Sequence, residues 1–319
     1  MFTKGLLWKW FISLYISIFI VVVFAIQGLC LAQEETVKTH AGKPPALWSS
    51  SVQGGYVRQD DTDTDNGGRF STDRMIVSVG IKYSPDWEKT FSLSLGYAAY
   101  DYNFSGNSGI AGLNPWEDIH SIRLGGFMRW RLDPKWTVFV APSLNMNAEA
   151  GADAGNALTG GLMGGVSYRF SDRLTIGPGI GVFNQLGETK VVPILLVQWK
   201  ITDRLSFDTG GGLGATLGPG LGFNYRLSEN WNFGVGARLE LLRFRLDDNG
   251  VAPSGIGEDS AISCYGNVTY SFNPMNRISL MAGSDFNGTL YLEDKDGNDV
   301  LKEDYDTAPF VGLTFNIRF

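Results

Sequence analysis

Few residues of this chain could perform acid–base or nucleophilic catalysis, because its 319 residues include only two histidines, His40 and His120. A serine hydrolase needs an imidazole within hydrogen-bond reach of the hydroxyl. Ser121 directly follows His120, and neighbours in a β-strand point to opposite faces, so the two cannot act as a pair within a strand. We therefore predict that the chain is not an enzyme.

Acidic residues are the remaining candidates for a metal site, and they crowd two segments. These residues are Asp60, Asp61, Asp63 and Asp65 in the first, and Asp294, Asp296, Asp299, Glu303, Asp304 and Asp306 in the second. Carboxylates one or two residues apart can converge on Ca²⁺, but the segment from Asp61 lacks the glycine and the distal glutamate of an EF-hand loop. Solvated loops are the alternative interpretation. Too few histidines and cysteines are present for a zinc site, so we predict no metal cofactor.

A nucleotide cofactor is equally unsupported. Gly210, Gly212 and Ala215 have the spacing of a dinucleotide-binding turn. That turn requires a buried parallel strand before it and a helix after it. No helical periodicity follows residue 33, and glycine also serves close strand contacts, so no cofactor is predicted.

The elements that would position any functional side chain are β-strands. Apolar residues alternate with small or polar residues along many segments, which is the period of a strand with one apolar face. Six short polar segments separate pairs of these strands and have tight-turn chemistry: 84–87, 132–136, 171–174, 202–205, 228–231 and 273–276. The intervening connections are longer and rich in Gly, Asp, Asn and Ser: 59–71, 103–118, 148–157, 247–260 and 291–307.

The last strand carries the most specific signal. Its apolar positions, from Val311 to Phe319, alternate with Gly312, Thr314, Asn316 and Arg318, and the sequence closes on an aromatic residue. This segment resembles the C-terminal signal strand of Gram-negative outer-membrane β-barrel proteins, with the candidate assembly signal at Gly312, Phe315, Ile317 and Phe319. The resemblance covers residues 47–319 and fits a functionally uncharacterised family of such barrels. It implies insertion by the barrel-insertion machinery and contact with outer-membrane lipid and lipopolysaccharide.

The predicted fold is therefore all-β, a transmembrane antiparallel up-and-down β-barrel. Short turns on one side and long polar loops on the other are typical of outer-membrane barrels, with the turns periplasmic. Six turns join twelve strands, and a first strand near 47–58 and a last strand at 308–319 bring the prediction to 14, with both termini periplasmic. Twelve strands is the alternative, because the first strand is weakly apolar.

Tryptophan placement gives an independent indication of a membrane barrel. Indole rings prefer the headgroup level of a bilayer. Six of the nine tryptophans lie near predicted periplasmic strand ends and form a candidate girdle: Trp48, Trp87, Trp130, Trp136, Trp199 and Trp231.

The N-terminus reads as a secretory signal. Residues 1–32 combine two lysines, a long apolar run and a Cys30-Leu31-Ala32 cleavage pattern, with an uncleaved transmembrane anchor as the alternative. Residues 33–46 would be a short periplasmic tail, followed by the barrel at 47–319. Cleavage removes two basic residues and no acidic one, so the net charge of −7 becomes −9. So acidic a chain repels phosphate backbones, and nucleic acid is not an expected partner.

If the apolar parity faces lipid, the other parity faces the lumen. That inner face carries small polar residues and charges, with these lumen charge candidates: Arg123, Arg129, Arg169, Arg238, Glu240, Asp208 and Asp285. A barrel of about 14 strands is wide enough for a narrow pore. A salt-bridged, closed lumen is an equally open interpretation.

One segment is apolar on both faces, Val191–Trp199, so that Val192, Ile194 and Leu196 would point inward beside the glycine-rich residues 209–214. Mutual packing and an apolar patch for a hydrophobic solute are the two interpretations. The leading functional prediction is a narrow passive channel for small solutes, the solute unknown. A closed barrel with ligand- or surface-binding extracellular loops is the alternative, and a hydrophobic-solute transporter is the third hypothesis.

Overall fold

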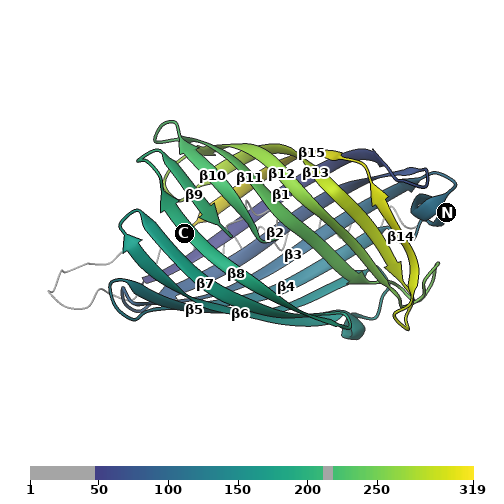
Figure 1. Ribbon diagram of the computed structural model, residues 1–319, viewed down its shortest axis with the longest axis horizontal. Helices are drawn as coiled ribbons and strands as arrows, with labels where there is room; N and C mark the ends of the chain where they lie inside the picture. The colour runs from purple at the N-terminus through teal and green to yellow at the C-terminus, as the bar shows by residue number, and fades with distance from the viewer. Residues whose placement is uncertain (1–46, 211–217) are drawn as a thin grey trace. The chain divides into compact units, whose positions relative to one another are not determined.

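The chain forms a closed wall of antiparallel strands, seen in the computed structural model, which describes residues 47–210 and 218–319 (Figure 1). The strands are β1 (Leu47–Asp63), β2 (Arg69–Ser84), β3 (Lys89–Ser105), β4 (Asp118–Arg131), β5 (Trp136–Glu149), β6 (Leu158–Ser171), β7 (Leu174–Gln185), β8 (Glu188–Lys200), β9 (Leu205–Thr209), β10 (Gly220–Arg226), β11 (Trp231–Arg245), β12 (Ile256–Ser271), β13 (Arg277–Glu293), β14 (Asp299–Tyr305) and β15 (Ala308–Arg318). Helix α2 (Gly109–Leu113) and the 3-10 turn η1 (Ala154–Ala157) lie in the connections. Within the described ranges, no helix is both long and apolar enough to cross a membrane.

Strand pairing confirms the predicted fourteen strands around the barrel wall. Consecutive strands pair from β1 to β13, and β15 pairs with β1 on one side and β13 on the other, which closes the barrel. β14 pairs with residues 288–293 of β13, and β15 pairs with residues 277–285 of the same strand. β14 and β15 thus share one place in the wall, which has fourteen positions.

The six predicted turns are all present, and a side chain stabilises each. Asp133 Oδ1 in the β4–β5 turn accepts hydrogen bonds from the backbone N–H groups of Lys135 (2.7 Å) and Trp136 (2.8 Å). Asp86, Ser171, Thr202, Ser228 and Asn273 play the corresponding part in the other turns. The Asx- and Ser/Thr-turn chemistry that indicated these hairpins therefore also holds them.

The opposite end of the barrel, called here the loop end, is more ordered than the sequence predicted. Several stretches assigned to polar loops continue as strand, among them 59–63 of β1, 103–105 of β3, 256–260 of β12 and 299–305, which is β14. Cross-strand hydrogen bonding satisfies the backbone there, so polar composition alone did not mark the end of the strands.

Hydrogen bonds between strands that are not neighbours identify the inner face. Arg74 on β2 pairs with Asp285 on β13 at 3.2 Å, although β1 and β15 lie between these strands in the wall. Register then assigns every other residue to the inside. The outer face carries half-exposed apolar side chains, among them Leu93, Leu95, Leu162, Ile180 and Leu280. A closed barrel with such a belt spans a bilayer, and the protein is an outer-membrane β-barrel.

At the loop end the wall narrows, because β5 and β11 meet. Arg245 and Ala148 pair in parallel, and Asn147 Nδ2 donates to the carbonyl of Arg243 at 3.1 Å. Asp247 N donates to Glu149 Oε2 at 3.0 Å. We call the part of the wall formed there by β1–β5 and β11–β14 the upper ring; β6–β10 take no part in the contact between β5 and β11.

Several sequence-based predictions fall outside the described residues. They are the signal peptide at 1–32 and the tail at 33–46 with His40. Most of the glycine-rich segment 209–214, including Gly212, and the following Ala215 also lie outside.

Candidate functional site: the barrel lumen

Three of the predicted lumen charges lie on the inner face and hydrogen-bond to neighbouring strands. Arg123 Nε donates to Asn145 Oδ1 at 2.9 Å. An Nη atom of Arg129 donates to Thr90 Oγ1 at 3.2 Å. Asp208 accepts from Asn224 Nδ2 at 3.1 Å. These bonds hold charged side chains against the wall instead of across the lumen.

The other predicted charges have different surroundings. Arg238 is buried, with Nε donating to the Tyr265 hydroxyl at 3.0 Å and an Nη donating to the carbonyl of Gly218 at 2.9 Å. Glu240 lies on the same face of β11, one inner-face position nearer the loop end, and Arg169 is exposed on β6. Asp285 is 1% exposed and pairs with Arg74.

The Arg74–Asp285 pair is part of a buried network that the sequence did not indicate. Asp259 on β12 accepts hydrogen bonds from the Tyr102 hydroxyl (2.8 Å) and the Tyr305 hydroxyl (3.1 Å). Arg74 also donates to Gln59 Oε1 at 2.6 Å. The bonds join strands from both sides of the lumen. These bonds form a polar layer, which lies next to the side chains that fill the upper ring.

On the loop-end side of this polar layer, an aromatic core fills the upper ring. Trp116 is 1% exposed and packs edge-on against Phe244 and Tyr102, with ring centroids 5.2 Å and 6.0 Å away. Phe70 packs against Tyr305 with centroids 4.9 Å apart. Leu290, Leu292 and Ile119 complete the contacts and are fully buried. This core, called here the aromatic plug, blocks the axis of the barrel at the loop end.

The β3–β4 connection supplies part of the plug. It carries α2, whose Ile110 is fully buried, and Trp116. Glu303 on β14 holds this connection, since its carboxylate accepts from the N–H of Ile110 at 2.6 Å and of Asn66 at 2.7 Å. Trp116 lies in the connection 103–118, as the sequence indicates, but its burial was not predicted. No periodic pattern surrounds it, because its partners are far along the chain.

Exposure along β3 and β4 shows where the plug ends. On the inner face of these strands Ser94, Arg123 and Phe127 are exposed, whereas Tyr102 and Ile119 nearer the loop end are buried. Inner-face side chains cannot reach lipid, so their exposure is to space inside the barrel. The lumen is therefore open beside β3 and β4 at mid-barrel and filled at the loop end. On β1, β12, β13 and β15, the inner-face side chains of Val57, Tyr265, Met281 and Phe310 form a buried cluster.

The opposite rim, which we call the turn end, carries a set of exposed cations on the inner face. They come from β2, β4, β6, β8, β10, β13 and β15: Lys82, Arg129, Arg169, Lys200, Arg226, Arg277 and Arg318. In the described strands, the one acidic side chain on the inner face of this half is Asp208. Cations gathered in a low-dielectric mouth raise the local concentration of anions.

An apolar wall occupies the side of the lumen formed by β4 to β8. Leu196, Ile194 and Val192 of β8 lie opposite Gly177, Gly179 and Gly181 of β7. A Cβ on Gly181 would come within 2.5 Å of the Phe183 ring. In the described part of the chain, the glycines that leave room for these side chains are those of β7. Mutual packing is present, and Val192 nevertheless remains 37% exposed.

The candidate girdle tryptophans all lie at the turn end. Trp48 is the second residue of β1, and Trp136 and Trp231 begin β5 and β11. Trp130 and Trp199 are the last residues but one of β4 and β8, and Trp87 is in the β2–β3 turn. The assembly-signal residues lie along β15: Gly312 faces the lumen with its register partner Val57, and Phe315 and Ile317 face outward. Phe319 follows the strand.

The histidine candidate is on the outer face. His120 Nδ1 lies 2.9 Å from the Tyr97 hydroxyl, and Ser121 points inward and donates to Asn147 Oδ1 at 2.7 Å. The two side chains are on opposite faces of β4, as strand geometry predicts.

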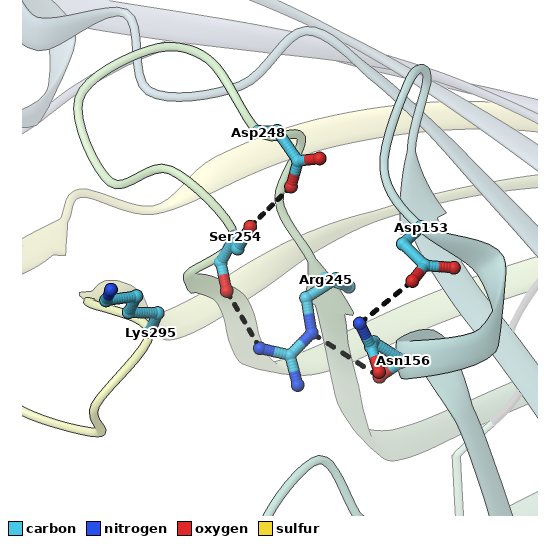
Figure 2. Close-up of a pocket in the computed structure, with 6 residues that line it drawn as sticks. All are labelled: Asp153, Asn156, Arg245, Asp248, Ser254 and Lys295. Atoms are coloured by element: carbon cyan, nitrogen blue, oxygen red, sulfur yellow. Dashed lines mark hydrogen bonds between the residues drawn. The ribbon is translucent and has the colours of Figure 1, made fainter.

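A small pocket opens among the connections at the loop end (Figure 2). It has a volume of about 210 Å³ and is lined by Asp153, Asn156, Arg245, Asp248, Ser254 and Lys295. Arg245 donates to the backbone carbonyls of Ser254 (2.9 Å) and Asn156 (3.4 Å). Its guanidinium thereby joins the connection after β11 to η1.

Sequence comparison assigns the barrel to a family. Residues 49–318 match the domain of unknown function DUF6268. The chain belongs to this family. The match runs from the start of β1 to the end of β15, so the DUF6268 domain and the barrel coincide. No protein of curated function matches the sequence.

Several solved structures are similar to the DUF6268 barrel. The COG4313 outer membrane channel from Pseudomonas putida F1 is 9% identical, with 89% of this chain and 100% of that chain covered and a TM-score of 0.48. The P. putida toluene transporter TodX is 10% identical, with 85% and 90% covered and a TM-score of 0.43. A Pseudomonas aeruginosa FadL homologue is 11% identical, with 86% and 89% covered and a TM-score of 0.38. The likeness does not extend to what those proteins transport.

Proposed function

We propose that the protein is a narrow passive channel for small solutes, whose loop end the aromatic plug closes in this structure. The observation that carries the proposal is the exposure of inner-face Ser94, Arg123 and Phe127 at mid-barrel. A barrel built only for rigidity would fill this level with packed side chains, as the upper ring is filled. Fourteen strands also leave a wider interior than small, side-chain-filled barrels.

The aromatic plug makes the proposed channel a gated one. Its connection from β3 to β4 is held by hydrogen bonds and ring contacts, and not by a continuous sheet ladder. Displacement of that connection would open the loop end without breaking the barrel wall. The wall itself pairs around its full circumference and is the rigid part.

Planar bilayers test the proposal directly. Purified, heat-modifiable protein should give discrete conductance steps in KCl, with anions preferred because inner-face cations exceed anions at the turn end. The preference should weaken in high salt as the charges are screened. Arg123→Glu should shift selectivity toward cations. A wild-type pore that prefers cations would show that the acidic loop end dominates the field.

A second candidate function is a closed barrel that binds a ligand through its loop end. The loop-end pocket favours this candidate, because Arg245 and Lys295 line it together. Bilayer silence from folded wild-type protein, and also from folded Trp116→Ala protein whose plug is loosened, would reject the channel and leave this second function.

A further inference from the structure

We propose that the lumen holds a binding site for a small aromatic carboxylate, built by Arg129 and Phe127 of β4 with Phe139 of β5. It rests on the proposed function, because the solute reaches the site through the lumen. By register the three residues lie on the inner face. Their strands, β4 and β5, are neighbours in the wall (Figure 1).

The aromatic part of the site is a pair of stacked rings. The centroids of Phe127 and Phe139 are 6.2 Å apart, with 24° between the ring planes. Phe139 is 5% exposed and lies against Gly165 of β6, where a Cβ would come within 2.8 Å of its ring. Phe127 is 38% exposed. Phe139 is therefore a fixed support, and Phe127 offers a free ring surface for an apolar, planar group.

The charged part of the site is next to this ring surface. Arg129 is the register partner of Phe139 and follows Phe127 on the same face of the same strand. Two residues along a strand are about 7 Å apart, which suits a solute whose carboxylate and ring are directly joined. The hydrogen bond to Thr90 uses one of the five guanidinium donors and fixes the group against β3. The remaining donors match a carboxylate, which guanidinium binds in bidentate fashion.

The charges around the site favour an anion over a neutral aromatic solute. Arg129 is one of the exposed cations of the turn end, with Lys82 and Arg169 on strands to either side. In the described part of the wall, no acidic side chain shares the inner face of β4 or β5 with these residues in the turn-end half. A neutral aromatic compound would gain only the ring contact, and acetate would gain only the charge.

Titration calorimetry with benzoate tests the site on the folded full-length barrel. Wild type should bind benzoate more tightly than either acetate or benzyl alcohol. Arg129→Gln should weaken benzoate binding roughly tenfold, the scale of one charge-assisted contact. Phe127→Leu, which keeps the volume apolar, should weaken it about twofold to tenfold. Arg318→Gln is the matched control, a cation of the same rim on β15, which β1, β2 and β3 separate from β4 in the wall, and should leave the affinity within about twofold.

The outcomes separate this site from the channel itself. Equal affinity for benzoate and acetate, or an equal loss in Arg129→Gln and Arg318→Gln, overturns the site and shows a general anion field. Conductance in KCl alone reports the channel: conduction without the benzoate preference rejects only the site. Benzoate binding that responds to Arg129→Gln, in protein silent in bilayers, rejects only the channel.

Discussion

Arg74 on β2 and Asp285 on β13 form a 3.2 Å ion pair inside the barrel, past the two strands that separate them in the wall. Their side chains are 13% and 1% exposed. Ser263 also hydrogen-bonds to Asp285, and Gln59 to Arg74. Charge buried this deeply is stable only when it is paired and hydrogen-bonded.

Removing one member of this pair should therefore cost more than an ordinary surface substitution. Asp285→Ala leaves the Arg74 charge buried without its partner, and we expect a loss of about 3–5 kcal/mol in the free energy of unfolding. Denaturant unfolding of the refolded barrel measures it. Asp73→Ala is the control, since Asp73 pairs with an Arg58 side chain that is 53% exposed, and a much smaller change is expected there. Equal losses would contradict the assignment of a buried pair.

Truncation of the plug tryptophan should loosen the loop end. Trp116→Ala removes a fully buried ring, at a cost of about 3–5 kcal/mol to the local packing, while the strand ladder stays complete. Single-channel recording should show longer or larger openings than in wild type. Trp87→Ala, in a turn where the side chain is 74% exposed, should leave conductance as it is. Identical traces for wild type and Trp116→Ala would place the barrier elsewhere.

The carboxylate of Glu303 should control how firmly the β3–β4 connection is held. Glu303→Ala leaves the N–H groups of Ile110 and Asn66 without their acceptor, so the connection should become a site of proteolysis. Gly109→Ala should do the same, because its Cβ would come within 2.5 Å of the Glu303 carboxylate at a φ of +58°. Limited proteolysis of purified barrel followed by mass spectrometry locates the cut. Asp304→Ala, on the same strand but with a side chain that accepts from the Thr289 hydroxyl, should stay resistant.

The two ends of the barrel should differ in access from outside the cell. On a Cys264→Ala background, Asn298→Cys in the β13–β14 turn should react with an impermeant thiol reagent on intact cells. Asp86→Cys in the β2–β3 turn should react only after the outer membrane is breached. Labelling of both positions on intact cells would contradict periplasmic turns.

The last strand should decide assembly. Deletion of residues 308–319 removes β15, which pairs with β1 and β13, and would leave unpaired backbone groups in lipid. We expect little heat-modifiable barrel in the outer membrane, and an intermediate yield for Phe319→Ala. Gel-shift assays of outer-membrane fractions measure both. A normal yield from the deletion would mean that β15 is dispensable for closure.

The fold could be predicted because its signals are local. Period-two alternation and the turn residues Asp86, Asp133 and Asn273 act within a few positions, and together they specify fourteen strands and six turns. Inner and outer parity followed from the same pattern. The signals fail where a strand is polar: β14 lies in an acidic stretch that has the composition of a loop, although it pairs with the nearby residues 288–293 of β13.

The contents of the lumen were predictable in type and not in arrangement. Arg123, Arg129 and Asp285 are on the inner face, but parity could not tell which is exposed and which is paired. Trp116 is buried by Phe244 and Tyr102, and Asp259 by two tyrosines from other strands. Such partners depend on how the wall closes, which no short segment encodes.

The capped turns bear on the order in which the barrel assembles. Each cap joins residues two or three positions apart, so a hairpin such as β4–β5 has its register set by contacts of low contact order, which form early. The seam between β1 and β15 joins Ser51 to Arg318 and carries the largest loop-closure entropy of the ladder. Closure of the seam is then the slow step, so substitutions along it should alter the rate of barrel closure, while Asp133→Ala should alter hairpin formation first. Time-resolved folding into lipid vesicles distinguishes the two.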